Sequence, residues 1–159
     1  MAVLSNETWR RHANPWSVWT RYAAFPLLVA AAWSYHWISW WALVPVGLVI
    51  VWLIVNPRAF PPPASTDNWA SKAVLGERSW VGLARGQVPA RHVVVPRIAS
   101  VIAAAASLLM VWGLVRRDAT LTLLSMALVM LAKTWFVDRM VWLFEDMKDS
   151  NPEYRSWLY

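Results

Sequence analysis

The chain has 159 residues, of which 58% are hydrophobic and 15% charged, with 14 Trp, no Cys and a formal net charge of +6. Soluble domains carry about 25% charged residues, and here the deficit is concentrated in long uncharged runs, which excludes an ordinary soluble domain and a disordered tail. The absence of Cys excludes disulfide scaffolds, thiolate zinc sites, iron–sulfur clusters and cysteine nucleophiles. The basic residues flank the apolar runs, so nucleic acid is not an expected partner.

The first apolar run extends from Tyr22 to Pro57 and contains no Lys, Arg, Asp or Glu. A single helix over this run would be about 54 Å long, against a hydrocarbon core of about 30 Å, so the run must fold back. The polar and aromatic residues at 34–41 are typical of a membrane interface and mark the reversal. The sequence therefore predicts two spans, at about 20–36 and 40–56.

Proline and asparagine mark both ends of this predicted hairpin. Asn14 followed by Pro15 predicts a helix start, with Asn14 as the N-cap and proline in the first turn. Pro57 disfavours a helical conformation at the residue before it, so the second span is expected to stop at Asn56.

Residues 66–85 place apolar side chains on one helical stripe and basic side chains on the opposite side. The stripe consists of Trp69, Ala73, Gly76, Trp80 and Leu83. Such an amphipathic helix suits the plane of the membrane interface, with Arg78 and Arg85 facing water. A helix packed on the cytoplasmic ends of the spans fits the same pattern, and both alternatives remain open.

Two further uncharged runs predict spans at about 96–115 and from 119 to 138 or beyond. Pro96 suits the first turn of the third span, where a missing N–H breaks no helical hydrogen bond. The expected fold class is therefore an all-α membrane protein with four transmembrane helices. These helices and the interfacial helix form a single integral-membrane domain over residues 1–159.

The third predicted span carries a ridge of small residues, Ala99, Ala103 and Ser107. Small side chains let another helix approach closely. The partner helix belongs either to this chain or to a second copy. A homo-oligomer or a larger membrane complex is accordingly one expectation for the partners, beside membrane lipids.

The basic residues predict the orientation of the four spans. With four spans, all but two of the 15 Lys and Arg residues lie on one side, and Arg116 and Arg117 lie on the other. Three spans would divide the larger group between both faces. The positive-inside rule therefore favours a multi-pass protein of the inner (cytoplasmic) membrane with both termini in the cytoplasm.

The polar residues expected at the cytoplasmic interface form the candidate site. Three arginines are candidate ligands of an anionic lipid headgroup, because a guanidinium group can hold two phosphate oxygens at once. These are Arg21, Arg58 and Arg78, and the polar cluster around them consists of His12, Asn14, Asn56, Glu77, Lys133, Asp138 and Arg139. The alternative is a belt of charges that sets orientation without forming a pocket.

Two of these residues lie on the fourth predicted span. Lys133 is about 21 Å along the helix from Ala119, so it is still in hydrocarbon or just leaving it. It is expected to snorkel, or to meet a carboxylate or a carbonyl of a neighbouring helix. Asp138 is expected to pair with an arginine such as Arg21 or Arg58.

The sequence contains no motif that predicts a catalytic residue, a metal site or a cofactor. The three histidines never stand at i, i+3 or i, i+4, and both the Gly-x-Ser-x-Gly elbow and the Walker-type phosphate loop are missing. The expected function is a non-enzymatic, lipid-interacting or accessory membrane subunit. The alternative is a membrane-embedded enzyme acting on a phospholipid-like substrate at the cytoplasmic face.

Four segments carry a resemblance to a known family. They are residues 12–21 (HANPWSVWTR), 56–61 (NPRAFP), 75–78 (LGER) and 135–140 (WFVDRM). Together they resemble a family of small prokaryotic integral-membrane proteins known only as a domain of unknown function, over roughly residues 9–147. The resemblance implies a multi-span membrane protein in prokaryotes, and it implies no activity or ligand.

Overall fold

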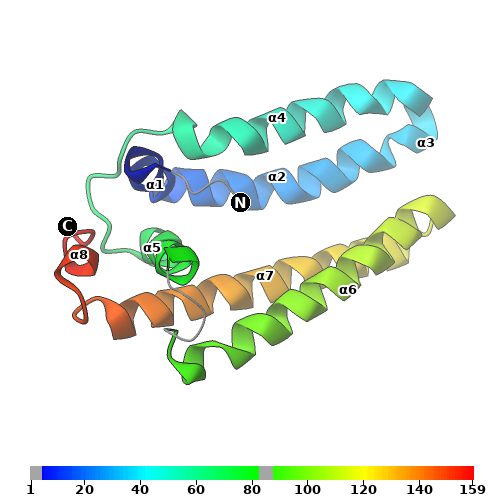
Figure 1. Cartoon of the computed structure of the whole chain (residues 1–159). Helices are drawn as coiled ribbons and strands as arrows, with labels where there is room; N and C mark the ends of the chain where they lie inside the picture. The colour runs from blue at the N-terminus through cyan, green and yellow to red at the C-terminus, as the bar shows by residue number, and fades with distance from the viewer. Residues whose placement is uncertain (1–4, 83–87) are drawn as a thin grey trace.

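The computed structural model describes residues 5–82 and 88–159, and within these ranges it contains helices and no strand (Figure 1). The elements are α1 (Asn6–His12), α2 (Pro15–Trp33), α3 (Tyr35–Ile38), the 3-10 helix η1 (Ser39–Ala42), α4 (Leu43–Ala59), α5 (Trp69–Gly82), the 3-10 helix η2 (Ala90–His92), α6 (Val94–Arg116), α7 (Ala119–Met147) and α8 (Pro152–Arg155). The predicted all-helical class is confirmed.

Three helical stretches in the described residues are long and apolar enough to cross a membrane: Pro15–Ala59, Ala90–Arg116 and Ala119–Met147. The first of them is a hairpin, because α2 and α4 run side by side and the chain reverses through α3 and η1 (Figure 1). The reversal lies where the sequence predicts it. Ser39 adopts a positive φ of 51° in this turn.

The helix boundaries of the first hairpin follow the prediction at one end only. α2 begins at Pro15, and the Asn14 side chain accepts a hydrogen bond of 2.9 Å from the backbone N–H of Trp16. The expected end at Asn56 is wrong, since α4 continues through Pro57 to Ala59. The Asn56 side chain is bonded to Ser17 and Thr20 of α2, and these bonds hold Asn56 within the helix.

The second hairpin consists of α6 and α7, which pack along most of their length. Three small buried residues of α6, Ala99, Ala106 and Gly113, recur every seven residues, as in the seam of a coiled coil. A Cβ added at Gly113 would lie 2.6 Å from the Thr122 hydroxyl of α7. Packing within the chain thus uses Ala99 of the predicted ridge, whereas Ala103 lines a cavity.

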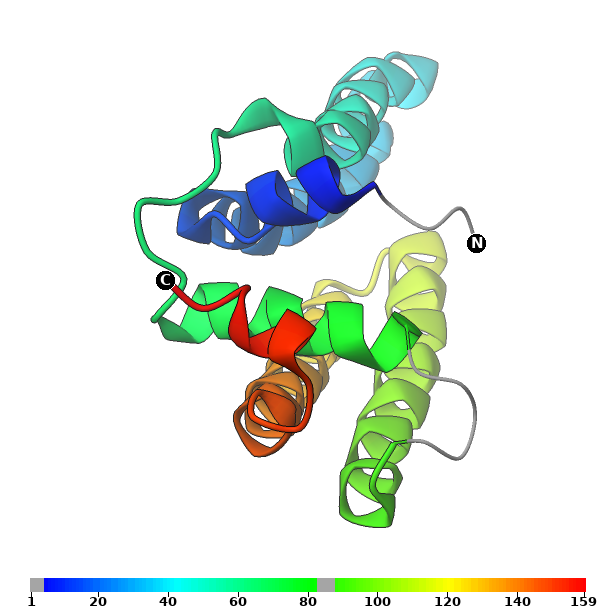
Figure 2. The same ribbon diagram turned by 60° about the vertical axis from the view of Figure 1, so that its left-hand side comes forward.

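Helix α5 packs across the ends of both hairpins, between α1 and α7 (Figure 2). Seven of its 14 residues are buried, so the packed alternative for residues 66–85 is the one observed. Leu83 and Arg85 of that prediction lie outside the described residues. A hydrophobic core joins α5 to α1, α2 and α7, and it consists of Trp9, Ala13, Val18, Ala70, Val74, Leu75 and Phe144.

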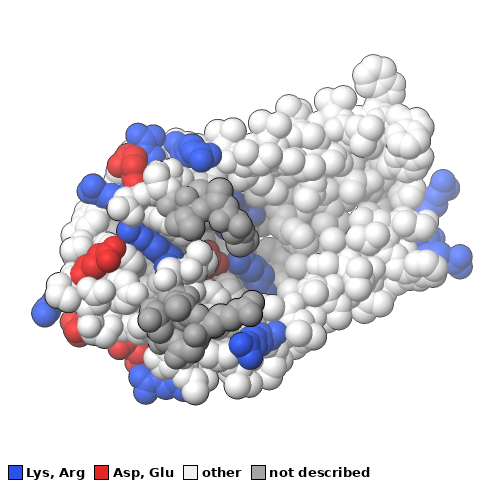
Figure 3. All heavy atoms as spheres, in the orientation of Figure 1, with Lys and Arg blue, Asp and Glu red and all other residues white. Residues whose placement is uncertain are grey.

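Charged side chains gather at the end of the molecule that α1, α5 and α8 form (Figure 3). A second, smaller basic group lies at the opposite end, where α6 ends at Arg116. The surface between the two ends is uncharged in this view. Large apolar side chains of the long helices are exposed, among them Leu48 and Ile54 of α4.

Candidate functional site

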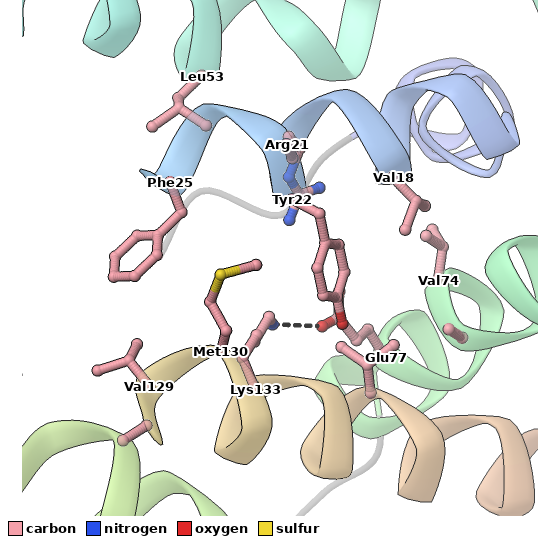
Figure 4. Close-up of a pocket in the computed structure, with 13 residues that line it drawn as sticks. Val18, Arg21, Tyr22, Phe25, Leu53, Val74, Glu77, Val129, Met130 and Lys133 are labelled. Atoms are coloured by element: carbon pink, nitrogen blue, oxygen red, sulfur yellow. Dashed lines mark hydrogen bonds and ion pairs between the residues drawn. The ribbon is translucent and has the colours of Figure 1, made fainter. Parts of the chain in front are cut away.

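A cavity of about 340 Å³ lies between the first hairpin and helices α5, α6 and α7 (Figure 4). Most of its wall is apolar and comes from five helices, with Phe25, Leu53, Val74, Ala103 and Met130 among the lining residues. The polar lining residues are Arg21, Tyr22, Glu77 and Lys133. The cavity therefore combines an apolar interior with a cluster of charged groups.

An ion pair joins α5 to α7 at this cavity. The Nζ atom of Lys133 lies 3.1 Å from Oε1 of Glu77, and Tyr22 points from α2 toward this pair (Figure 4). The alternative that Lys133 meets a carboxylate of a neighbouring helix is thus the observed one. With Arg21 on the opposite wall, the charged lining residues comprise two cations and one carboxylate.

Arg21 also contacts the imidazole ring of His12, which is 4% exposed. Burial, followed by the charges of Arg21 and Lys133, lowers the pKa of His12 to about 3, so the ring is neutral at pH 7. A neutral imidazole accepts at one nitrogen and donates from the other. Arg21 has only donors, so it donates to Nε2, and Nδ1–H donates to the Ser17 hydroxyl at 3.1 Å.

The hydrogen bonds continue from Ser17 through the interior of the first hairpin. The Ser17 hydroxyl donates to Oδ1 of Asn56 at 2.7 Å, and Nδ2 of Asn56 donates to the Thr20 hydroxyl at 2.8 Å. We call His12, Ser17, Thr20, Arg21 and Asn56 the His12 network. It links α1, α2 and α4, and it holds Arg21 at the cavity wall through His12.

The other two candidate arginines take different positions. Arg58 is exposed near the end of α4, and its carbonyl accepts a hydrogen bond from Arg11. The Arg78 guanidinium donates to Asn6 at 2.9 Å and lies 3.8 Å from the centre of the Trp157 ring. Its side chain is only 11% exposed, so the expectation that Arg78 faces water is wrong.

Asp138 pairs with an arginine, as expected, but the partner is the adjacent Arg139, so the choice of Arg21 or Arg58 is wrong. Its carboxylate lies 2.9 Å from Nη2 of the adjacent Arg139 and accepts a hydrogen bond of 3.3 Å from the Trp69 indole. Asp138 faces the first turn of α5, because α5 packs across α7 at this level. Both of its oxygens have partners, and the bond from Trp69 joins α5 to α7.

The structure thus brings His12, Arg21 and Asn56 into one network, and Glu77 and Lys133 into one cavity. Asn14, Asp138 and Arg139 lie outside both groups, and the Asn14 amide donates to the Pro61 carbonyl at 2.9 Å. The sequence analysis did not predict that Ser17 and Thr20 belong to the network or that Tyr22 lines the cavity. Ser17, Thr20 and Arg21 stand at i, i+3 and i+4, and this spacing was the available signal for a shared polar face.

Within the described residues, no group of three or more His, Asp or Glu side chains is placed to hold a metal ion. Comparison with curated proteins and with solved structures gave no match. The sequence model of a family described as "Family of unknown function (DUF6653)" matches residues 2–157. The resemblance to a family of unknown function is thereby confirmed, and the chain belongs to the DUF6653 family.

Proposed function

We propose that this protein is a multi-pass membrane protein that binds an anionic lipid between its two helical hairpins and catalyses no reaction. The observation that carries the proposal is the cavity with apolar walls and with Arg21 and Lys133 beside it. Apolar walls accommodate a lipid chain, and the two cations face the region where a headgroup would lie.

We propose that the chain crosses the membrane four times, through α2, α4, α6 and α7. α2 has 19 residues and α4 has 17, which correspond to about 28 Å and 26 Å of helix and approach the thickness of the hydrocarbon core. α6 and α7 are longer. The charged end formed by α1, α5 and α8 is the cytoplasmic side of an inner membrane, because it carries most of the basic residues.

The charge balance at the cavity favours an anionic group. Lys133 and Arg21 together outweigh the single carboxylate of Glu77, and an unbalanced positive charge next to apolar walls attracts an anion more strongly than it would in bulk water. In this proposal, Arg21 and Lys133 bind the headgroup directly. Arg58 and Arg78 add to the general attraction of the cytoplasmic end for anionic lipids.

An enzyme acting on a phospholipid-like substrate is the alternative function. One observation favours it, since the hydroxyl oxygen of Tyr22 is buried at the cavity and makes no hydrogen bond to a described residue. The non-enzymatic proposal is preferred because the neighbouring groups are already paired: Glu77 with Lys133, and His12 with Arg21 and Ser17. Incubation of the purified protein with labelled phospholipids distinguishes the two, because only an enzyme would release a modified lipid.

Native mass spectrometry of the purified protein with mixed anionic and zwitterionic phospholipids tests the binding site. Lys133→Gln is expected to lower retention of anionic lipid by about fivefold, because one interfacial charge contributes about 1 kcal/mol to binding. Arg58→Gln is the matched control, because it removes the same charge from an exposed position outside the cavity. Equal effects of the two substitutions would favour a diffuse belt of charges and contradict the pocket.

A further inference from the structure

The hydroxyl group of Tyr22 is a buried donor for which the described residues provide no acceptor. It lies at the cavity between the two hairpins and makes no hydrogen bond to a described residue. Thr134 of α7 lies near it, but the Thr134 hydroxyl donates to the Met130 carbonyl at 2.8 Å. Buried polar groups almost always have a hydrogen-bond partner, because an unpaired one has lost its bonds to water. The position of the Tyr22 hydroxyl therefore points to a partner that enters the cavity.

Packing holds the Tyr22 ring in place, and this fixes the position of its hydroxyl oxygen. The ring centre lies 5.9 Å from that of Trp19, and Trp19 stacks on Trp69 of α5 with ring centres 5.7 Å apart. Tyr22 also packs against the hydrophobic core that joins α5 to α1, α2 and α7. From α2 the side chain points across the cavity toward the Glu77–Lys133 pair (Figure 4). The hydroxyl is thus directed into the site before any ligand binds.

The groups around the Tyr22 hydroxyl favour an anionic oxygen as its partner. Arg21 and Lys133 line the same cavity, and their charges outweigh the single carboxylate of Glu77. An excess of positive charge attracts an anion, and a hydroxyl group donates its strongest hydrogen bonds to charged oxygens. Glu77 does not take this role, because its Oε1 atom lies 3.1 Å from Nζ of Lys133 and neither of its oxygens bonds to Tyr22.

We infer that Tyr22 is a third headgroup ligand of this site, and that its hydroxyl donates to an oxygen of the anionic group that Arg21 and Lys133 bind. The inference rests on the proposed function, since it uses the same cavity and the same class of ligand. A lipid phosphate suits the three donors, because it has several acceptor oxygens. Tyr22 then has a binding role in place of the catalytic role that an enzyme would give it.

Retention of phosphatidylglycerol by the purified full-length protein, measured by native mass spectrometry, tests the inference. Tyr22→Phe removes the hydroxyl group and keeps the ring. It is expected to lower retention about tenfold, because a hydrogen bond to a charged acceptor is lost. Tyr35→Phe is the matched control, since Tyr35 is exposed in α3 and lies outside this cavity, and its retention should equal that of the wild type.

The unfolding temperature in a non-ionic detergent without added lipid separates a binding role from a structural one. Tyr22→Phe should leave this temperature unchanged or raise it, because the hydroxyl that it removes has no partner among the described residues. If the hydroxyl instead bonded to Thr134, both Tyr22→Phe and Thr134→Val would lower the unfolding temperature and neither would change retention. That result would overturn the inference, as would a failure of Tyr22→Phe to fold.

The outcomes separate this inference from the proposed function. If Lys133→Gln lowers retention and Tyr22→Phe does not, the headgroup site stands and the role of Tyr22 is wrong. If neither substitution changes retention, the proposed function itself is overturned. Release of a modified lipid by the wild type, but not by Tyr22→Phe, would make Tyr22 a catalytic residue and would overturn both.

Discussion

Gly76 of α5 lies directly against the backbone carbonyl group of Met140 in α7. A Cβ added at Gly76 would lie 2.5 Å from the carbonyl carbon of Met140, closer than non-bonded carbon atoms approach. Only glycine therefore lets the two helices cross at this distance. The crossing also determines the site, because the next residue of α5, Glu77, then reaches Lys133.

Gly76→Ala is expected to destabilise the protein by about 3 kcal/mol, since the methyl group forces α5 away from α7. The control is Gly47→Ala in α4, where an added Cβ meets no atom within 4 Å. Alanine favours a helix by about 1 kcal/mol over glycine, so the control should be neutral or stabilising. Thermal unfolding in detergent measures both, and a stable Gly76→Ala variant would contradict the close crossing.

His12 predicts a dependence of stability on pH. Its pKa is about 3 in the folded protein and 6.5 when unperturbed, so between these values the unfolded chain binds more protons than the folded one. Stability should therefore fall as pH decreases from 6.5 toward 3, by at most about 1.4 kcal/mol per pH unit from this group. Above pH 6.5 the contribution of His12 should be constant.

The measurement for His12 is the denaturation midpoint at pH 6.5 and at pH 5, in the wild type and in His12→Gln. Glutamine retains hydrogen-bonding groups but does not titrate, so the variant should lose less stability between the two pH values. His92→Gln is the control, because His92 pairs with Asp146 outside the His12 network. An unchanged pH dependence in His12→Gln would show that other groups are responsible.

Asp138→Asn is expected to destabilise the fold by about 1 kcal/mol, because it removes a charge-assisted bond to Arg139 beside the Trp69 contact. Asp149→Asn makes the same chemical change in the turn between α7 and α8, where the carboxylate is 66% exposed and 3.7 Å from Arg155. Its effect should stay within about 0.5 kcal/mol. Equal unfolding temperatures of the two variants would indicate that Asp138 contributes no more than a solvated carboxylate.

Single cysteines report on the proposed topology, because the native chain contains none. Ser65→Cys is expected to stay protected from a membrane-impermeant maleimide added to intact cells, whereas Ser39→Cys and Thr120→Cys should be labelled. All three positions are exposed. A cysteine at Asp118 would remove the side chain that caps α7 through the Leu121 N–H, so the probe is placed at Thr120 instead. Labelling at Ser65 would overturn the assignment of cytoplasmic ends.

The sequence alone determined the features that depend on local composition. The uncharged run from Tyr22 to Pro57 is too long for one crossing, and its polar and aromatic centre predicted the reversal through α3 and η1. The stripe in residues 66–85 predicted a helix where α5 occurs. These features follow from hydropathy, helical periodicity and charge along the chain, which do not require knowledge of neighbouring helices.

Only the tertiary structure decided which polar groups meet. The sequence left open which carboxylate or carbonyl Lys133 would meet. The close crossing of α5 and α7 at Gly76 places Glu77 beside it. Arg78 was expected in water, yet packing of the carboxyl-terminal residues over α5 buried it against Trp157. The rotation and crossing angle of each helix determine such contacts, and they depend on how the apolar surfaces of all the helices fit together.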